Sequence, residues 1–134
     1  MRLLLDTHML LWWITDNPML SANARELIGN PNNQIYCSLI SIWELEIKRA
    51  APSARIEYSG EQLLGFCQAY GFQILPLKAP HILQMKNLKR KAGSAPHKDP
   101  FDRIMICQAM AENMLFVTHD YKLTAYETGC IRHV

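Results

Sequence analysis

The chain has 134 residues, of which 49% are hydrophobic and 19% are charged, and its formal net charge is +2. This length suits one domain spanning residues 1–134 with a sizeable core, and the balance of apolar and charged residues excludes an intrinsically disordered chain. The small net charge, taken alone, identifies no class of partner.

Short apolar runs alternate with helix-like stretches along the whole chain. The opening run, Arg2–Leu5, predicts a buried strand, and the helix that follows it should end near Asn17 and Pro18. Further strands are predicted over residues 34–37, 72–75, 114–118 and 130–134, the last of them at an edge. Further helices are predicted over residues 21–28, 38–49, 60–70, 79–88, 102–113 and 122–127. Glycine, serine and proline predict a mobile loop over residues 89–98.

The predicted strands are short and apolar throughout rather than alternating between apolar and polar residues. This pattern is typical of a parallel sheet that helices cover on both faces. With right-handed crossovers it predicts an α/β fold, a three-layer α/β/α sandwich around a mainly parallel sheet of four to five short strands. In such sheets, functional residues gather at the carboxyl ends of the strands.

Acidic residues stand at two of these predicted strand ends. Asp6 directly follows the first strand, and Asp120 follows the strand over residues 114–118. An N-cap would explain either residue alone, because aspartate accepts hydrogen bonds from free helix N–H groups. Two acids at one edge of a parallel sheet favour a shared site. Thr118 could orient a carboxylate or a metal-bound water there through its hydroxyl.

Three further acids lie in predicted helices or at their starts. Glu44 lies between apolar residues, although an ion pair with Lys48 four residues later would also explain it. Asp99 precedes Pro100 and suits an N-cap, whereas Asp102 lies in the first turn of the same helix. Asp102 could point into a cleft or simply complement the helix dipole.

Together these acids predict a metal centre. Clustered carboxylates repel one another strongly, and a hard divalent cation is the usual reason for their assembly. Carboxylate oxygens suit Mg²⁺ or Mn²⁺, which can activate water for in-line attack on a phosphodiester. The spacing leaves open whether one or two ions act.

Basic residues are concentrated in the middle of the chain. No acidic residue occurs in residues 62–98, whereas lysines and an arginine cluster in residues 86–91. A solvated surface explains such a run, and contact with the backbone of a polyanion is the alternative. Arg103 could contact a phosphate or pair with one of the acids.

The cysteines and the N-terminal run bear on localisation. Cys37, Cys67, Cys107 and Cys130 are widely spaced, which disfavours a zinc site or a disulfide framework. The opening apolar run is far too short for a signal peptide or a membrane span. We therefore expect a cytoplasmic protein.

Four short strings in order, Leu-Leu-Leu-Asp-Thr-His, Ser-Ile-Trp-Glu-Leu, Asp-Pro-Phe-Asp-Arg and Val-Thr-His-Asp, resemble motifs of the PIN-domain family. They are most similar to those of its VapC-type ribonuclease toxins from toxin–antitoxin systems. The resemblance extends from Met1 to about Tyr126. It implies a Mg²⁺ or Mn²⁺ cofactor, single-stranded or loop RNA as substrate, a homodimer and a small antitoxin that occludes the site.

The resemblance also assigns residues. The family's catalytic and metal-binding quartet falls on Asp6, Glu44, Asp102 and Asp120. We expect Asp6 and Asp102 to be direct ligands, with the other two holding further metal or its waters. Asp99 belongs to the third motif and is treated as auxiliary. The chemistry of the residues themselves adds Thr118 and Arg103 as auxiliary candidates, and Lys89, Arg90 and Lys91 as candidates for contact with the RNA backbone.

Some residues near the expected site have competing interpretations. His119 stands where many family members have arginine. Trp12 and Trp13 could stack on bases, but neighbouring helix residues point different ways, so one should lie in the core and one at an interface. For His8 and His97, surface or N-terminal hydrogen bonding is preferred over a metal role.

Other acidic α/β proteins fit the sequence less well. A receiver domain needs an aspartate after the third strand, where this chain has Leu75, Pro76 and Leu77, and an aspartyl phosphatase needs one at His8. A dinucleotide-binding module needs a glycine-rich turn after the first strand. The remaining alternative is a non-catalytic PIN-like module that binds RNA or protein.

Overall fold

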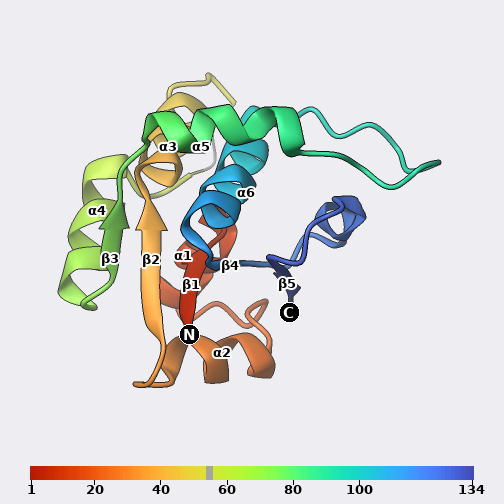
Figure 1. Cartoon of the computed structure of the whole chain (residues 1–134). Helices are drawn as coiled ribbons and strands as arrows, with labels where there is room; N and C mark the ends of the chain where they lie inside the picture. Colours follow the sequence, from red (N-terminus) through yellow and green to blue (C-terminus); the bar gives the residue numbers. More distant parts are fainter. Residues whose placement is uncertain (54–55) are drawn as a thin grey trace.

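A five-stranded, wholly parallel sheet forms the centre of the molecule (Figure 1). The structure is a computed structural model that describes residues 1–53 and 56–134. The strand order is β3-β2-β1-β4-β5. The strands are β1 (Arg2–Leu5), β2 (Gln34–Ser38), β3 (Gln73–Leu75), β4 (Leu115–Thr118) and β5 (Ile131–His133). The predicted α/β sandwich is confirmed, and the sheet has the upper of the two predicted strand numbers.

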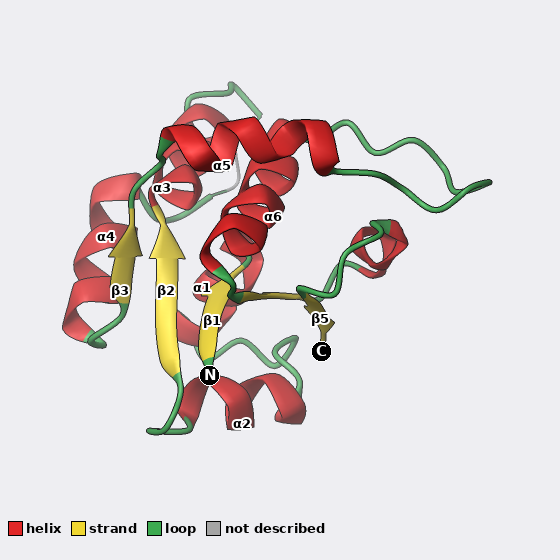
Figure 2. Ribbon diagram, in the orientation of Figure 1, coloured by secondary structure: helices red, strands yellow, loops and turns green. Residues whose placement is uncertain are grey.

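Helices cover both faces of this sheet (Figure 2). The α-helices are α1 (Thr7–Ile14), α2 (Ala22–Gly29), α3 (Leu39–Arg49), α4 (Gly60–Ala69), α5 (Ala79–Leu83) and α6 (Pro100–Glu112). Two 3₁₀ helices complete the set, η1 (Gln84–Asn87) and η2 (Tyr121–Ala125). In the described part of the chain, none of the helices is both long and apolar enough to pass through a membrane.

The core has one apolar cluster on each face of the sheet. Leu3 and Leu5 of β1 join the cluster beneath α1, α2 and α4, whereas Leu4 joins the cluster beneath α6. All three leucines are fully buried. Successive strand residues point to opposite faces, so a strand that is apolar throughout is what two covered faces require.

Capping residues decide where several helices begin. Asp99 accepts hydrogen bonds from the backbone N–H groups of Phe101 and Asp102, at 2.9 and 3.1 Å. Pro100 then occupies the first helical position, where it needs no donor. Helix α6 therefore begins two residues before the predicted start at Asp102.

Two of the predicted helices are tighter or shorter than expected. The segment over residues 79–88 splits into α5 and η1, and the segment over residues 122–127 is the 3₁₀ helix η2. Short segments gain little from α-helical cooperativity, and 3₁₀ turns serve as connectors in such places.

The order of the strands reverses beside β1. The chain fills the positions of β2 and β3 on one side of β1, and later those of β4 and β5 on the other. The carboxyl ends of β1 and β4 thus flank a topological switch point, where ligands bind in open parallel sheets. Asp6 and Asp120 follow these two strands.

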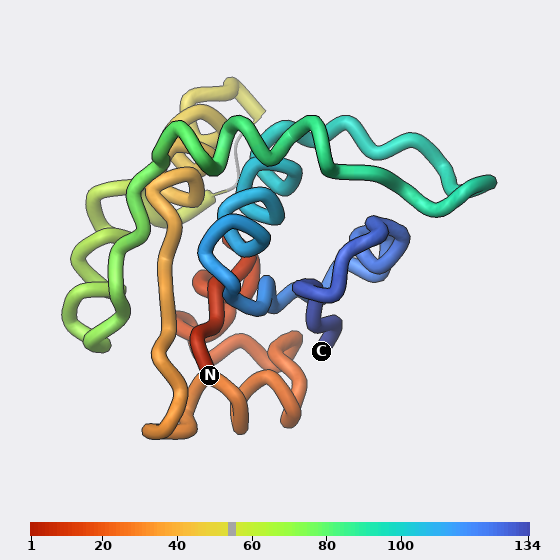
Figure 3. Tube along the Cα trace, in the orientation of Figure 1, coloured from red at the N-terminus to blue at the C-terminus, as the bar shows by residue number. Residues whose placement is uncertain are grey.

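The segment over residues 89–98 extends from the body beside η2, as the trace in Figure 3 shows. Its first residues are hydrogen-bonded to the end of η2 and to the chain just after it. The N–H of Lys91 donates to the carbonyl of Ala125, and the N–H of Glu127 donates to the carbonyl of Lys89, both at 2.7 Å.

Candidate active site

A single threonine joins the two acids at the strand ends. Asp6 caps α1 by accepting a hydrogen bond from the N–H of His8 at 3.2 Å, and it is only 6% exposed. Its other oxygen accepts a 2.7 Å hydrogen bond from the hydroxyl of Thr118, the last residue of β4. The same hydroxyl accepts from the N–H of Asp120 at 3.0 Å. Thr118 therefore fixes the orientation of both acid-bearing segments.

Glu44 points into the molecule from the second turn of α3. It is 4% exposed, and one carboxylate oxygen accepts a 2.7 Å hydrogen bond from the hydroxyl of Thr7. The other oxygen forms the predicted ion pair with Lys48. Burial alone would lower the pKa of Lys48, but the hydrogen bond and charge of Glu44 raise it overall. Glu44 therefore forms the ion pair with Lys48 within α3 and is also a buried carboxylate of fixed orientation.

The pKa of Asp102 is raised by burial and by the charges of the other acids. Because Asp99 takes the capping bonds of α6, the Asp102 carboxylate is free to face the other acids. Burial raises its pKa to about 8, assisted by the negative charges of the four other predicted acids, Asp6, Asp99, Glu44 and Asp120. The structure therefore brings the four other acids within electrostatic reach of Asp102.

Little positive charge from the protein compensates this cluster. Within the described residues, the ion pairs to the predicted quartet come from Lys48 to Glu44 and from His97 to Asp102. Burial also raises the pKa of Asp6, and the charge of Glu44 adds to the effect. Carboxylates held together at such cost are suited to a bound cation.

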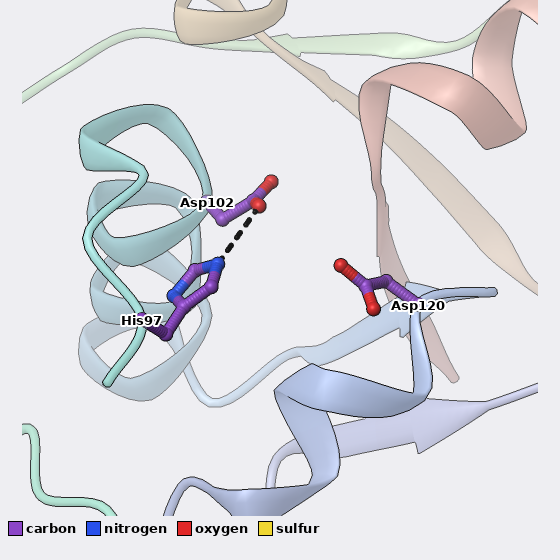
Figure 4. A group of neighbouring side chains, drawn as sticks. All are labelled: His97, Asp102 and Asp120. Atoms are coloured by element: carbon purple, nitrogen blue, oxygen red, sulfur yellow. Dashed lines mark ion pairs between the residues drawn. The ribbon is translucent and has the colours of Figure 1, made fainter. Parts of the chain in front are cut away.

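Three of the site's side chains form a group that could hold one metal ion, and Figure 4 shows them. Possible ligand atoms of His97, Asp102 and Asp120 all lie within 4.8 Å of one another. Nε2 of His97 is 3.4 Å from Oδ2 of Asp102. The sequence interpretation placed His97 near the site and preferred surface or N-terminal hydrogen bonding over a metal role. The fold places it against two of the acids.

The predicted basic residues differ in how they are held. The guanidinium of Arg90 donates to the carbonyls of Ala95 at 2.9 Å and Lys122 at 3.2 Å. It also lies 4.7 Å from the centre of the Tyr126 ring. The side chains of Lys89 and Lys91 are exposed. Arg90 therefore fastens the loop to η2, while the two lysines face solvent.

Arg103 lies beside the same loop. Its guanidinium donates to the backbone carbonyl of His97 at 3.4 Å, a long hydrogen bond. This contact links α6 to the segment that carries His97.

A row of aromatic rings lies beside the acids. Trp12 is in edge contact with His8 and His119, with centroids 5.8 and 5.3 Å apart. His119 stacks on His133 at 5.9 Å, and His133 contacts Tyr121 at 5.6 Å. We call Trp12, His119, His133 and Tyr121 the aromatic row. Its members come from α1, β5, η2 and the turn between β4 and η2, so no local sequence signal could have revealed it.

A hollow elsewhere on the molecule is less suited to this chemistry. It has a volume of about 590 Å³ and lies at the amino ends of β1 and β4, with Met1, Arg2 and Leu115 in its lining. It contains none of the predicted acids.

A family profile described as the PIN domain matches residues 3–128. The chain belongs to the PIN-domain family. The predicted resemblance is confirmed over nearly the whole chain. PIN-domain nucleases generally depend on divalent metal ions, in agreement with the acid cluster. A comparison with curated proteins finds no significant match.

Solved structures share the fold of this PIN domain. A chain of VapBC2 from Rickettsia felis, bound to a DNA fragment from their promoter, matches with a TM-score of 0.68 and 19% identity, covering 99% of this chain and 98% of that one. DNA-bound VapBC from Salmonella typhimurium matches with a TM-score of 0.63 and 15% identity, covering 100% of this chain and 97% of that one. A toxin–antitoxin complex from Klebsiella pneumoniae matches at 0.60 and 17%, covering 98% of each chain. At these identities the likeness establishes the fold.

Proposed function

We propose that this PIN domain is a metal-dependent endoribonuclease, the toxin of a cytoplasmic toxin–antitoxin pair, which hydrolyses RNA phosphodiester bonds with Mg²⁺ or Mn²⁺. One observation carries the proposal: beside the switch point between β1 and β4, four further acids lie within electrostatic reach of Asp102, with ion pairs to the predicted quartet only from Lys48 and His97 among the described residues. A purely structural cluster would be expected to pair its charges.

The donor set fits a hard divalent cation. Asp6 and Asp102 are the proposed direct ligands, with Glu44 and Asp120 holding further metal or its waters, and Asp120 lies close enough to Asp102 to share its ion. When bound, the ion would lower the pKa of a water molecule and neutralise charge on the phosphate. Thr118 keeps Asp6 and Asp120 in place, and Lys48 together with Thr7 orients Glu44.

The surface around the acids supports single-stranded RNA as the substrate. Lys89 and Lys91 offer cations for the backbone, and the aromatic row offers rings on which unpaired bases can stack. Arg103 lies close enough to the site, through its contact with His97, to approach a phosphate.

The proposed protein partners are a small antitoxin that occludes the acids and a second copy of this chain. The antitoxin is supported by the similar structures, which are themselves toxin–antitoxin complexes. The homodimer rests on the family resemblance. Size-exclusion chromatography with light scattering would test both, with and without co-expression of the protein encoded by a short upstream gene.

Cleavage of a labelled single-stranded RNA tests the enzymatic proposal. The purified protein should cut it with Mg²⁺ or Mn²⁺ and lose the activity in EDTA, leaving 5′-phosphate and 3′-hydroxyl ends. Asp102→Asn should reduce the rate by about a thousandfold or more, because it removes a charge that the metal requires. RNA binding without any cleavage by the wild type would instead favour the non-catalytic PIN-like module.

A further inference from the structure

His97 faces two of the proposed metal-binding acids with a ring nitrogen. Its Nε2 lies 3.4 Å from Oδ2 of Asp102, and Asp120 offers a carboxylate oxygen within 4.8 Å of both residues' ligand atoms. In Figure 4 the His97 ring and the Asp102 carboxylate, both from the α6 side, face the Asp120 carboxylate beyond β4.

These separations suit ligands of one small cation. With metal–ligand bonds of about 2.1 to 2.2 Å, adjacent octahedral ligands lie roughly 3 Å apart and opposite ones roughly 4.3 Å apart. The 3.4 Å pair is close to the spacing of adjacent ligands. The 4.8 Å limit exceeds that of opposite ligands by only about half an ångström, which a change of side-chain torsion can absorb.

The imidazole is also held in the manner of a metal ligand. Its Nδ1 is 2.6 Å from the hydroxyl of Tyr126, a residue that is only 3% exposed. Arg90 covers the Tyr126 ring and pairs with its backbone through an antiparallel bridge. When Nδ1–H donates to this hydroxyl, the lone pair of Nε2 points at the acids. Metal-binding histidines commonly use their second nitrogen in this way.

A neutral nitrogen suits this site electrostatically. Each further carboxylate would add to the repulsion that already surrounds Asp102, whereas an imidazole adds a ligand without negative charge. Imidazole also favours transition-metal ions, while Mg²⁺ favours oxygen ligands.

We propose that His97 supplies a nitrogen ligand, through Nε2, to the divalent cation held by Asp102 and Asp120, and thereby gives the site a preference for Mn²⁺ over Mg²⁺. The inference rests on the proposed metal-dependent function. Tyr126 is the positioning residue for this ligand.

Metal titration of the full-length, metal-free protein tests the preference. His97→Ala should weaken Mn²⁺ binding about tenfold or more and should weaken Mg²⁺ binding less. Glu26→Gln, which alters an exposed acid of α2 outside the acid cluster, should leave Mn²⁺ affinity unchanged. An unchanged Mn²⁺ affinity in His97→Ala, or an equal loss for both ions, would overturn the inference.

Pulsed EPR of bound Mn²⁺ tests the nitrogen bond itself. The wild type should show a ¹⁴N coupling that is replaced by a ¹⁵N coupling after ¹⁵N-histidine labelling and that is lost in His97→Ala. The wild-type measurement stands even where the variant fails to fold. Bound Mn²⁺ without nitrogen coupling, or a coupling that persists in His97→Ala, overturns this inference alone. Failure to bind either ion overturns the metal-dependent function as well.

Discussion

The buried carboxyl of Asp102, proposed as a metal ligand, should destabilise the metal-free fold at neutral and higher pH. Its pKa of about 8 means that the folded, metal-free protein holds a proton there that the unfolded chain releases near its ordinary pKa of 3.8. The stabilisation is complete below the unfolded pKa and is lost progressively as pH rises to the folded pKa. The metal-free fold should therefore weaken between about pH 4 and pH 8.

Replacing this acid should remove the pH-dependent loss. Asp102→Asn and the wild type should melt at similar temperatures near pH 4.5. As pH rises the wild type should lose stability at this position, so that at pH 8.5 the variant melts about 5 °C or more above it. Melting curves in EDTA, followed by circular dichroism, measure the difference. Glu26→Gln, at an exposed acid of α2, is the control and should show no such trend. A constant difference at all pH values would contradict the assignment.

Thr118 acts on the acids through its hydroxyl. Thr118→Val keeps the shape but removes the donor to Asp6 and the acceptor for the N–H of Asp120. We expect RNA cleavage to fall about ten- to a hundredfold, as is typical when a partner of a metal ligand is lost. Thr118→Ser retains the hydroxyl and should retain most of the rate. Equal rates for the valine and serine variants would show that the hydroxyl has no such role.

The start of α6 carries two acids with different roles: Asp99 caps the helix, and Asp102 belongs to the acid cluster. Asp99 satisfies two backbone donors, and this leaves Asp102, one turn further, free to face the cluster. Asp99→Ala should cost about 1 kcal/mol of unfolding free energy, whereas Asp99→Asn should cost little because asparagine caps equally well. Urea denaturation of both variants checks this. A large loss in Asp99→Asn would indicate that the charge of Asp99, and not the cap, matters to the fold.

The elements also show which parts of the site were predictable. Asp6 directly follows one apolar strand and Asp120 comes two residues after the end of another, so their common edge follows from parallel pairing alone. The sequence placed His97 near the site but could not show that its ring faces two of the acids, because a loop containing glycine and proline has no period that fixes the direction of a side chain. The aromatic row was equally hidden, since Trp12 and His133 meet only after distant strands pair. Local patterns therefore predicted the acids but not their neighbours from other elements.

At the scale of the whole molecule, the switch point brings two surfaces to the same acids. The aromatic row approaches from α1, β5 and η2, while the loop over residues 89–98 extends beside η2 with its lysines exposed. A strand of RNA crossing the acids would meet rings on one part of its path and cations on another. Recognition of this kind favours unpaired nucleotides of varied sequence.

The basic loop gives a prediction that separates binding from folding. Lys89→Ala combined with Lys91→Ala should weaken RNA binding and make the slope of log K against log salt about 1.4 less steep, since each phosphate contact to a single strand contributes about 0.7. Melting temperature should be unchanged, because both side chains are exposed. Arg90→Ala should instead lower the melting temperature, since its guanidinium holds the carbonyls of Ala95 and Lys122. An unaltered salt slope in the double lysine variant would exclude this loop from the RNA path and leave the aromatic row as the principal contact.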